Sequence, residues 1–179
     1  VLGRPGTNGR VLLPYVNDGS GNFVVGASLG QPMSMGGLGF ADIDIDGDLD
    51  LLVVGSSGSG DVYQGKRVDY YVNDGNGILV GPNPISMWMR DGNVFASDFD
   101  GDGDADFAGA GVRGNPSGLR VVWKFVNQGG TSFSTSAIAG DTTGGLLMGT
   151  ISGADFDGDG DWDLVGNGDQ NLLPQKWNL

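Results

Sequence analysis

The chain of 179 residues contains no cysteine, no histidine and no glutamate. Without cysteine it forms no disulfide and offers no thiolate to a metal or a substrate. Without histidine it lacks the side chain that most often serves as a general base near neutral pH. Its longest aliphatic run, "LLVV" at 51–54, is far too short to span a bilayer. These absences weigh against thiol chemistry, against most acid–base enzymes and against a membrane span.

Negative charge is present and concentrated in three clusters. All 22 acidic residues are aspartates, and the net charge is −13. The clusters hold fifteen of them at alternate positions: Asp42, Asp44, Asp46, Asp48, Asp50; Asp98, Asp100, Asp102, Asp104, Asp106; Asp155, Asp157, Asp159, Asp161, Asp163. Outside the clusters 7 acids (22 minus 15) face 9 bases, so the rest of the chain is close to neutral. No basic patch is available for phosphates, and nucleic-acid binding is not expected.

The clusters belong to an internal repeat. They start at Asp42, Asp98 and Asp155, which are 56 and 57 residues apart, and "YVNDGSGNF", "YVNDGNGIL" and "FVNQGGTSF" recur in phase with them. Two landmarks in register predict true repeats. We place the units at 1–66, 67–120 and 121–172, with 173–179 as the first strand of an incomplete fourth unit.

The repeats have the character of β-strands. "VDYYV" and "RVVWKFV" are rich in β-branched and aromatic residues, and Asn-Asp-Gly after such a run favours a hairpin. The 36 glycines disfavour helices. The sequence therefore predicts an all-β fold, with about four antiparallel strands per unit as in a propeller blade.

The clustered carboxylates predict three Ca²⁺ sites. Two unit charges 4 Å apart repel by roughly 1 kcal/mol even in water, and no lysine or arginine lies within the clusters. Ca²⁺ takes six to eight oxygen ligands, and alternate side chains of an extended loop share a face. Glycine at the sixth position (Gly47, Gly103, Gly160) supplies a sharp turn.

Other metal motifs fit less well. An EF-hand needs a bidentate glutamate at position 12, where this chain has Val53, Gly109 and Gly166, and it needs flanking helices. A Ca²⁺-binding β-roll needs a nine-residue period, which is absent. Mg²⁺ prefers fewer carboxylates and several retained waters.

The D-x-D-x-D-G-D-x-D loop between strands resembles the FG-GAP/VCBS repeats of integrin-α-type β-propellers; "ADFDGDGDWDL" and "YVNDGNG" resemble the VCBS variety. The resemblance implies one Ca²⁺ per loop. It makes the first, second, third and fifth aspartates of each cluster side-chain ligands, and the fourth (Asp48, Asp104, Asp161) a carbonyl ligand. Family propellers commonly have seven blades, so three units are too few to close a ring alone. The chain opens with valine, and "LLPYVN" near its start is echoed by "LLPQKWN" near its end. We therefore expect part of a longer propeller or chains that complete one another.

The resulting expectation is a non-catalytic, extracellular or cell-surface Ca²⁺-binding protein for adhesion or for binding a glycan or protein ligand. One alternative is a structural subunit of a surface assembly or filament. Another is an accessory module of a polysaccharide-active enzyme. Among the tryptophans, Trp162 is the best candidate for a surface contact, Trp88 could be exposed or buried, and Trp123 and Trp177 are expected in the core.

Overall fold

The computed structural model describes residues 11–30, 33–34, 36–57, 65–113, 118–140 and 145–169. Within these ranges the chain forms strands and turns and no helix, which confirms the all-β prediction. The expected incomplete fourth unit at 173–179 and Trp177 lie outside the described residues.

Two four-stranded antiparallel sheets form the centre of the molecule. The first contains β3 (Leu38–Ala41), β4 (Asp50–Ser56), β5 (Lys66–Asn73) and β6 (Leu79–Ile85), side by side in chain order. The second contains β7 (Met89–Ser97), β8 (Asp106–Arg113), β9 (Leu119–Asn127) and β10 (Phe133–Ala139), in the same order. Each is a blade of the expected four strands.

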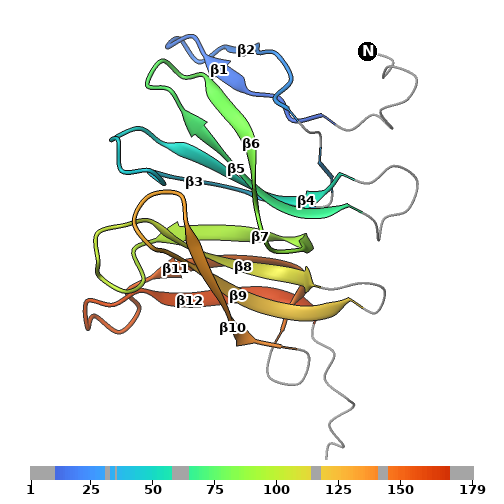
Figure 1. Cartoon of the computed structure of the whole chain (residues 1–179), viewed down its shortest axis with the longest axis vertical. Helices are drawn as coiled ribbons and strands as arrows, with labels where there is room; N and C mark the ends of the chain where they lie inside the picture. Colours follow the sequence, from blue (N-terminus) through green and yellow to red (C-terminus); the bar gives the residue numbers. More distant parts are fainter. Residues whose placement is uncertain are drawn as a thin grey trace, which may run out of the picture.

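A two-stranded ribbon lies on either side of this pair. β1 (Tyr15–Asn17) and β2 (Phe23–Val25) precede the first sheet, and β11 (Leu147–Ala154) and β12 (Asp163–Asp169) follow the second. Figure 1 shows the four pieces stacked in chain order, with β7 against the first sheet and β11 against the second. None of the sheets closes on itself.

The sheets are offset from the units expected from the sequence. The boundary at 66/67 falls at the start of β5 and the boundary at 120/121 falls within β9. Each four-stranded sheet therefore takes two strands from one unit and two from the next. In each sheet the cluster lies between the first and second strands. The hairpin between the third and fourth strands is Asn-Asp-Gly at 73–75 in the first sheet and Asn-Gln-Gly at 127–129 in the second.

Apolar cores fill the spaces between sheets. Leu52, Val54 and Val68 of the first sheet pack against Val94 and Phe107 of the second. Ala108 and Ala110 on the opposite face of the second sheet contact Ile151 of β11. Alternate residues of one strand thus face opposite neighbours, as expected for a sheet buried on both sides. This stacking holds the cluster loops in fixed relation to one another.

Candidate metal centres

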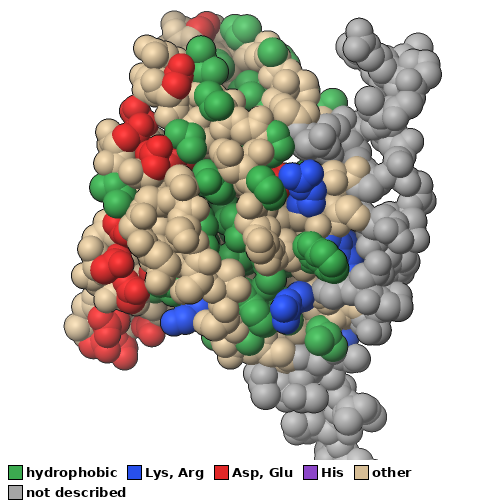
Figure 2. All heavy atoms as spheres, viewed as in Figure 1, with side chains coloured by type: hydrophobic (Ala, Val, Ile, Leu, Met, Phe, Trp, Pro, Cys, Tyr) green, Lys and Arg blue, Asp and Glu red, His purple; other side chains and the backbone are tan. Residues whose placement is uncertain are grey.

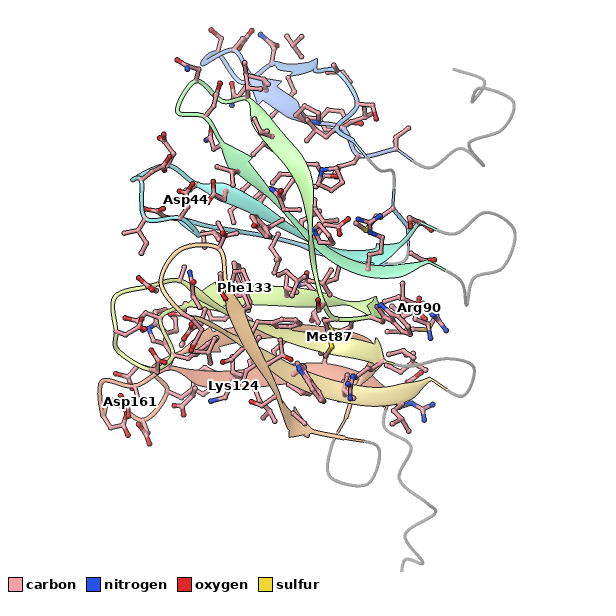
Figure 3. All side chains as sticks on the ribbon, viewed as in Figure 1. Asp44, Met87, Arg90, Lys124, Phe133 and Asp161 are labelled. Carbon is pink, nitrogen blue, oxygen red and sulfur yellow. The ribbon has the colours of Figure 1, made fainter. Side chains whose placement is uncertain are left out.

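The three aspartate clusters form the turns between β3 and β4, between β7 and β8, and between β11 and β12. Figure 1 shows these turns at the same edge of the stacked sheets, and Figure 2 shows acidic side chains gathered along that edge. Asp44 and Asp161 lie on this side in Figure 3, whereas Arg90 lies at the opposite ends of the strands. The fold therefore collects the negative charge on one face.

Each turn brings three carboxylates together. In every cluster the first, second and fifth aspartates offer oxygen atoms that lie within 4.8 Å of one another: Asp42, Asp44 and Asp50; Asp98, Asp100 and Asp106; Asp155, Asp157 and Asp163. Three anionic oxygens at this separation repel one another, and a single cation between them would contact all three.

The first aspartate of each cluster holds the turn closed. Asp98 accepts hydrogen bonds from the backbone N–H groups of Gly101 at 2.7 Å and Gly103 at 2.9 Å. Gly103 has φ = 94°, a conformation that glycine adopts without steric cost. The corresponding glycines, Gly47 and Gly160, have φ values of 95° and 97°. The glycine expected to supply a sharp turn does so in all three loops.

The fifth aspartate anchors the loop to the sheet. Asp106 is fully buried, and its two oxygens accept the N–H groups of Phe99 at 3.0 Å and Asn127 at 2.8 Å. Asp50 makes the same pair of bonds, with Ile43 at 2.8 Å and Asn73 at 2.7 Å. Each carboxylate keeps further lone pairs that could bind a cation.

The third and fourth aspartates lie outside the triads. Asp46, Asp102 and Asp159 each accept a hydrogen bond from the N–H two residues ahead, at 3.0, 2.9 and 2.9 Å. The third aspartate therefore shapes the turn, a part that the sequence analysis did not assign to it. The N–H donors in these bonds belong to the fourth aspartates, Asp48, Asp104 and Asp161.

The electrostatics of the triads favour an added positive charge. Burial, followed by repulsion from Asp50, Asp46 and Asp42, raises the pKa of Asp44. Its Oδ1 atom is buried without a hydrogen-bond donor. Burial also raises the pKa of Asp106, against the lowering effect of its two backbone hydrogen bonds.

No described cation relieves this repulsion. Arg67 pairs with Asp69 and Arg90 pairs with Asp91, and neither of these acids belongs to a cluster. An all-oxygen donor set with high negative charge and one orphaned buried oxygen fits a hard cation with several ligands, and Ca²⁺ meets that description better than Zn²⁺ or Cu²⁺.

Sequence reasoning missed the asparagines that brace the loops. Asn127 donates its backbone N–H to Asp106 and its Nδ2 group to the Ile43 carbonyl of the neighbouring loop, at 2.9 Å. Asn73 donates its Nδ2 group to the Leu49 carbonyl of its own loop at 3.2 Å. Asn73 and Asn127 follow the fifth aspartate of the preceding cluster by 23 and 21 residues, but their motif was interpreted only as a landmark of the repeat and as a hairpin turn.

Three of the tryptophans can be placed. The Trp162 ring lies 5.6 Å from that of Phe95 while remaining about half exposed. Trp88 is exposed, and Trp123 is partly buried beneath the guanidinium of Arg113 at 4.3 Å. The described part of the chain contains no helix long and apolar enough to cross a membrane.

Residues 98–166 match the family model described as an FG-GAP-like repeat. The matched segment runs from the second aspartate cluster through the third, so it includes β8 to β11 and two of the three triads. No curated protein matches the chain.

Proposed function

Because residues 98–166 match the FG-GAP-like repeat model, we propose that the chain is a non-catalytic β-propeller-like module of that repeat family, whose loops bind three Ca²⁺ ions and which serves adhesion or ligand binding outside the cell. The observation that carries the proposal is the recurrence of one aspartate triad per repeat, with oxygens within 4.8 Å. A chance acidic surface would not place the same three loop positions together three times.

The first, second and fifth aspartates would hold the ion in each loop. Neutralising them would remove the repulsion within the triad and would order a glycine-rich turn. A metal ion in this role stabilises the fold and does not have to contact a substrate. The absence of histidine, cysteine and glutamate leaves few groups for acid–base or nucleophilic catalysis, which supports a binding rather than an enzymatic role.

An extracellular location would suit Ca²⁺ sites of the expected affinity. Ca²⁺ sites of extracellular modules have dissociation constants of roughly 10⁻⁴–10⁻³ M, so they fill in a calcium-rich medium and empty in cytosol. A chain without cysteine is also indifferent to an oxidising environment. The ligand classes that suit such a module are glycans and proteins. The sequence offers no basic patch that would favour the binding of nucleic acid.

Calorimetric titration with Ca²⁺ tests the metal sites. We expect three ions per chain for the unmodified protein and two for Asp100→Asn, since Asp100 is exposed and accepts no hydrogen bond from a described residue that the substitution would break. The control is Asp74→Asn, which removes one charge from the β5–β6 turn outside every triad. Equal effects of the two variants would mean that the triads are not the binding sites.

Chelation provides an independent readout. Addition of EGTA should lower the melting temperature, because three uncompensated triads then oppose folding. Differential scanning calorimetry with and without EGTA measures this. A melting transition that is identical in both buffers would overturn structural Ca²⁺.

A further inference from the structure

The repeated sheets allow the same position to be compared in different surroundings. Leu38 on β3, Val94 on β7 and Ile151 on β11 are equivalent, since they pair with Val53, Gly109 and Gly166 at matching places. Val94 and Ile151 are each 4% exposed because the preceding sheet covers them, but Leu38 is 49% exposed. On this face of the first sheet Val53 is buried in a cluster with Leu12, so the uncovered part of the face is the part at β3 that carries Leu38.

At the opposite end of the stacked sheets, β12 also carries apolar side chains that no following sheet in the described part of the chain covers. Leu52 on β4, Ala108 on β8 and Val165 on β12 are equivalent positions that point toward the following sheet. Leu52 and Ala108 are 0% exposed, whereas Val165 is 56% exposed. Phe156 is 57% exposed, although its counterpart Ile43 is fully buried. We call the surface around Leu38 the leading face and the surface around Val165 and Phe156 the trailing face.

The two ribbons are complementary halves of one sheet. In the complete sheets the second strand pairs with the third, as β4 pairs with β5 and β8 pairs with β9. β11 and β12 correspond to the first and second strands, and β1 and β2 correspond to the third and fourth. Among described residues, β12 pairs only with β11 and β1 pairs only with β2. The sheet order β11–β12–β1–β2 would reproduce the order of the complete sheets.

A hydrogen bond that both complete sheets contain is absent, among the described residues, at β12 and at β1, the two strands that would pair. Asp50 Oδ1 accepts the N–H of Asn73, and Asp106 Oδ1 accepts the N–H of Asn127. The equivalent Asp163 uses Oδ2 to accept the N–H of Phe156, but its Oδ1 has no donor among described residues. Asn17, at the end of β1, occupies the position of Asn73, and no described carboxylate accepts its backbone N–H.

We propose that a second copy of this chain covers each open face, so that two copies associate head to tail. β11–β12 of one copy and β1–β2 of the other form one four-stranded sheet, in which Asn17 donates to Asp163 across the junction. The trailing face of one copy covers the leading face of the other, as the first sheet covers Val94 within the chain. The contact extends an interface that the chain already forms twice.

Two such junctions close the pair into a ring. The described parts of two copies contain twenty-four strands, twelve from each, which would make six sheets of four. Propellers typically contain about four to eight blades, and six falls within that range. The interface is heterologous, because different surfaces of the two copies meet, and closure leaves no free edge for further addition. This pairing goes beyond the proposed cation-dependent module and requires no external ligand.

Light scattering coupled to size exclusion tests the proposal in a Ca²⁺ buffer. We expect the unmodified chain to have twice the mass of one chain. Leu38→Asp on the leading face and Val165→Asp on the trailing face should each shift the protein to the mass of one chain, because a carboxylate would be buried at both junctions. Ile78→Asp is the matched control, since Ile78 is equally exposed but lies in the β5–β6 turn. It should leave the pair intact.

Mixing the two variants is the decisive experiment. A head-to-tail pair of Leu38→Asp with Val165→Asp contains one junction that carries both substitutions and one that carries neither. The mixture should therefore recover a pair, whereas each variant alone remains single. Circular dichroism confirms that both variants fold, as expected for substitutions at exposed positions.

Other outcomes would overturn the pairing. These are a single chain at every concentration, a pair that survives both substitutions, a mixture that does not recover, or an open series of longer polymers. Calcium titration of the same samples keeps the two proposals separate. Three Ca²⁺ sites in a protein that stays single would overturn the pairing and leave the proposed function intact.

Discussion

Asp69 on β5 is fully buried although its charge is only partly compensated. Its Oδ1 atom accepts hydrogen bonds from Nε and Nη2 of Arg67 at 3.1 and 2.9 Å, but its Oδ2 atom is buried without a donor. Burial raises the pKa of Asp69 above its ordinary value of 3.8, and the Arg67 guanidinium offsets only part of that rise. The ionised form of this carboxyl therefore opposes folding.

Replacing Asp69 by asparagine should stabilise the protein at neutral pH. We expect the free energy of unfolding to rise by roughly 1 kcal/mol, which is a common cost of an unsatisfied buried acceptor. Because the folded-state pKa is raised, the penalty is absent below the unfolded pKa, grows as the pH rises from the unfolded to the folded pKa, and is complete above the folded one. The difference between Asp69→Asn and the unmodified protein should thus be small near pH 3 and full at pH 7, as measured by urea denaturation.

Asp18 provides a control of opposite sign. Hydrogen bonds from Asn22 and Ser20 lower the pKa of Asp18, so its contribution to stability is present above the unfolded pKa and is lost as the pH falls. Asp18→Asn should therefore be neutral in acid and unfavourable at pH 7. An Asp69→Asn profile that follows the Asp18→Asn profile would show that burial does not dominate at Asp69.

At the scale of the elements, Asn127 links two loops that lie on different sheets. It is fully buried at the end of β9, where it bonds to Asp106 of the second loop and to the Ile43 carbonyl of the first. Ile43 lies between two aspartates of the first triad, Asp42 and Asp44. The backbone of the first loop therefore depends on a residue 84 positions away.

Asn127→Ala should weaken Ca²⁺ binding at the first loop as well as destabilise the fold. The substitution leaves the Ile43 carbonyl without its donor, at a cost of about 1–3 kcal/mol. The control is Asn83→Ala, which removes an amide whose Nδ2 group bonds to the Val80 carbonyl of β6 and to no cluster loop. Calorimetric titration in an Asp100→Asn background isolates the first and third sites. If binding there is unchanged by Asn127→Ala, the link between loops is only structural.

The same loops and strands show which features of the fold and of the metal sites could be predicted from the sequence. Alternate spacing and the glycine at the sixth position were enough to predict that Asp42, Asp44 and Asp50 converge, because a turn at Gly47 brings the fifth aspartate back to the first two. It was also enough to predict four strands per repeat, since β-branched runs and hairpin turns are local features. It could not assign Asp46 to the turn, since a ligand and a turn-forming carboxylate have the same spacing and chemistry.

Contacts between sheets could not be predicted from the sequence, for a different reason. The bond from Asn127 to Ile43 joins distant segments, and no local pattern reports it. The sequence also did not show which strands share a sheet, because the boundary of a repeat can be drawn before any of its strands. Only the pairing of β4 with β5 and of β8 with β9 shows that each sheet spans two of the expected units.

At the scale of the whole molecule, charge is separated between the two ends of the strands. The loop aspartates lie along one edge, while Arg90 lies toward the other, as Figures 2 and 3 show. The clusters contain fifteen aspartates in a chain of net charge −13. Without divalent ions this edge should repel itself and limit the stability of the stacked sheets.

This separation predicts a stability that depends on salt only when Ca²⁺ is absent. In EGTA, the melting temperature should rise as NaCl increases, because the screening length falls from about 10 Å at 0.1 M to about 3 Å at 1 M. In saturating Ca²⁺ the loop charges are already compensated, so the same increase in NaCl should change the melting temperature much less. Calorimetric scans across a NaCl series in both buffers compare the two slopes. Equal slopes would mean that repulsion at the acidic edge does not limit folding, and the loops would then need another source of their order.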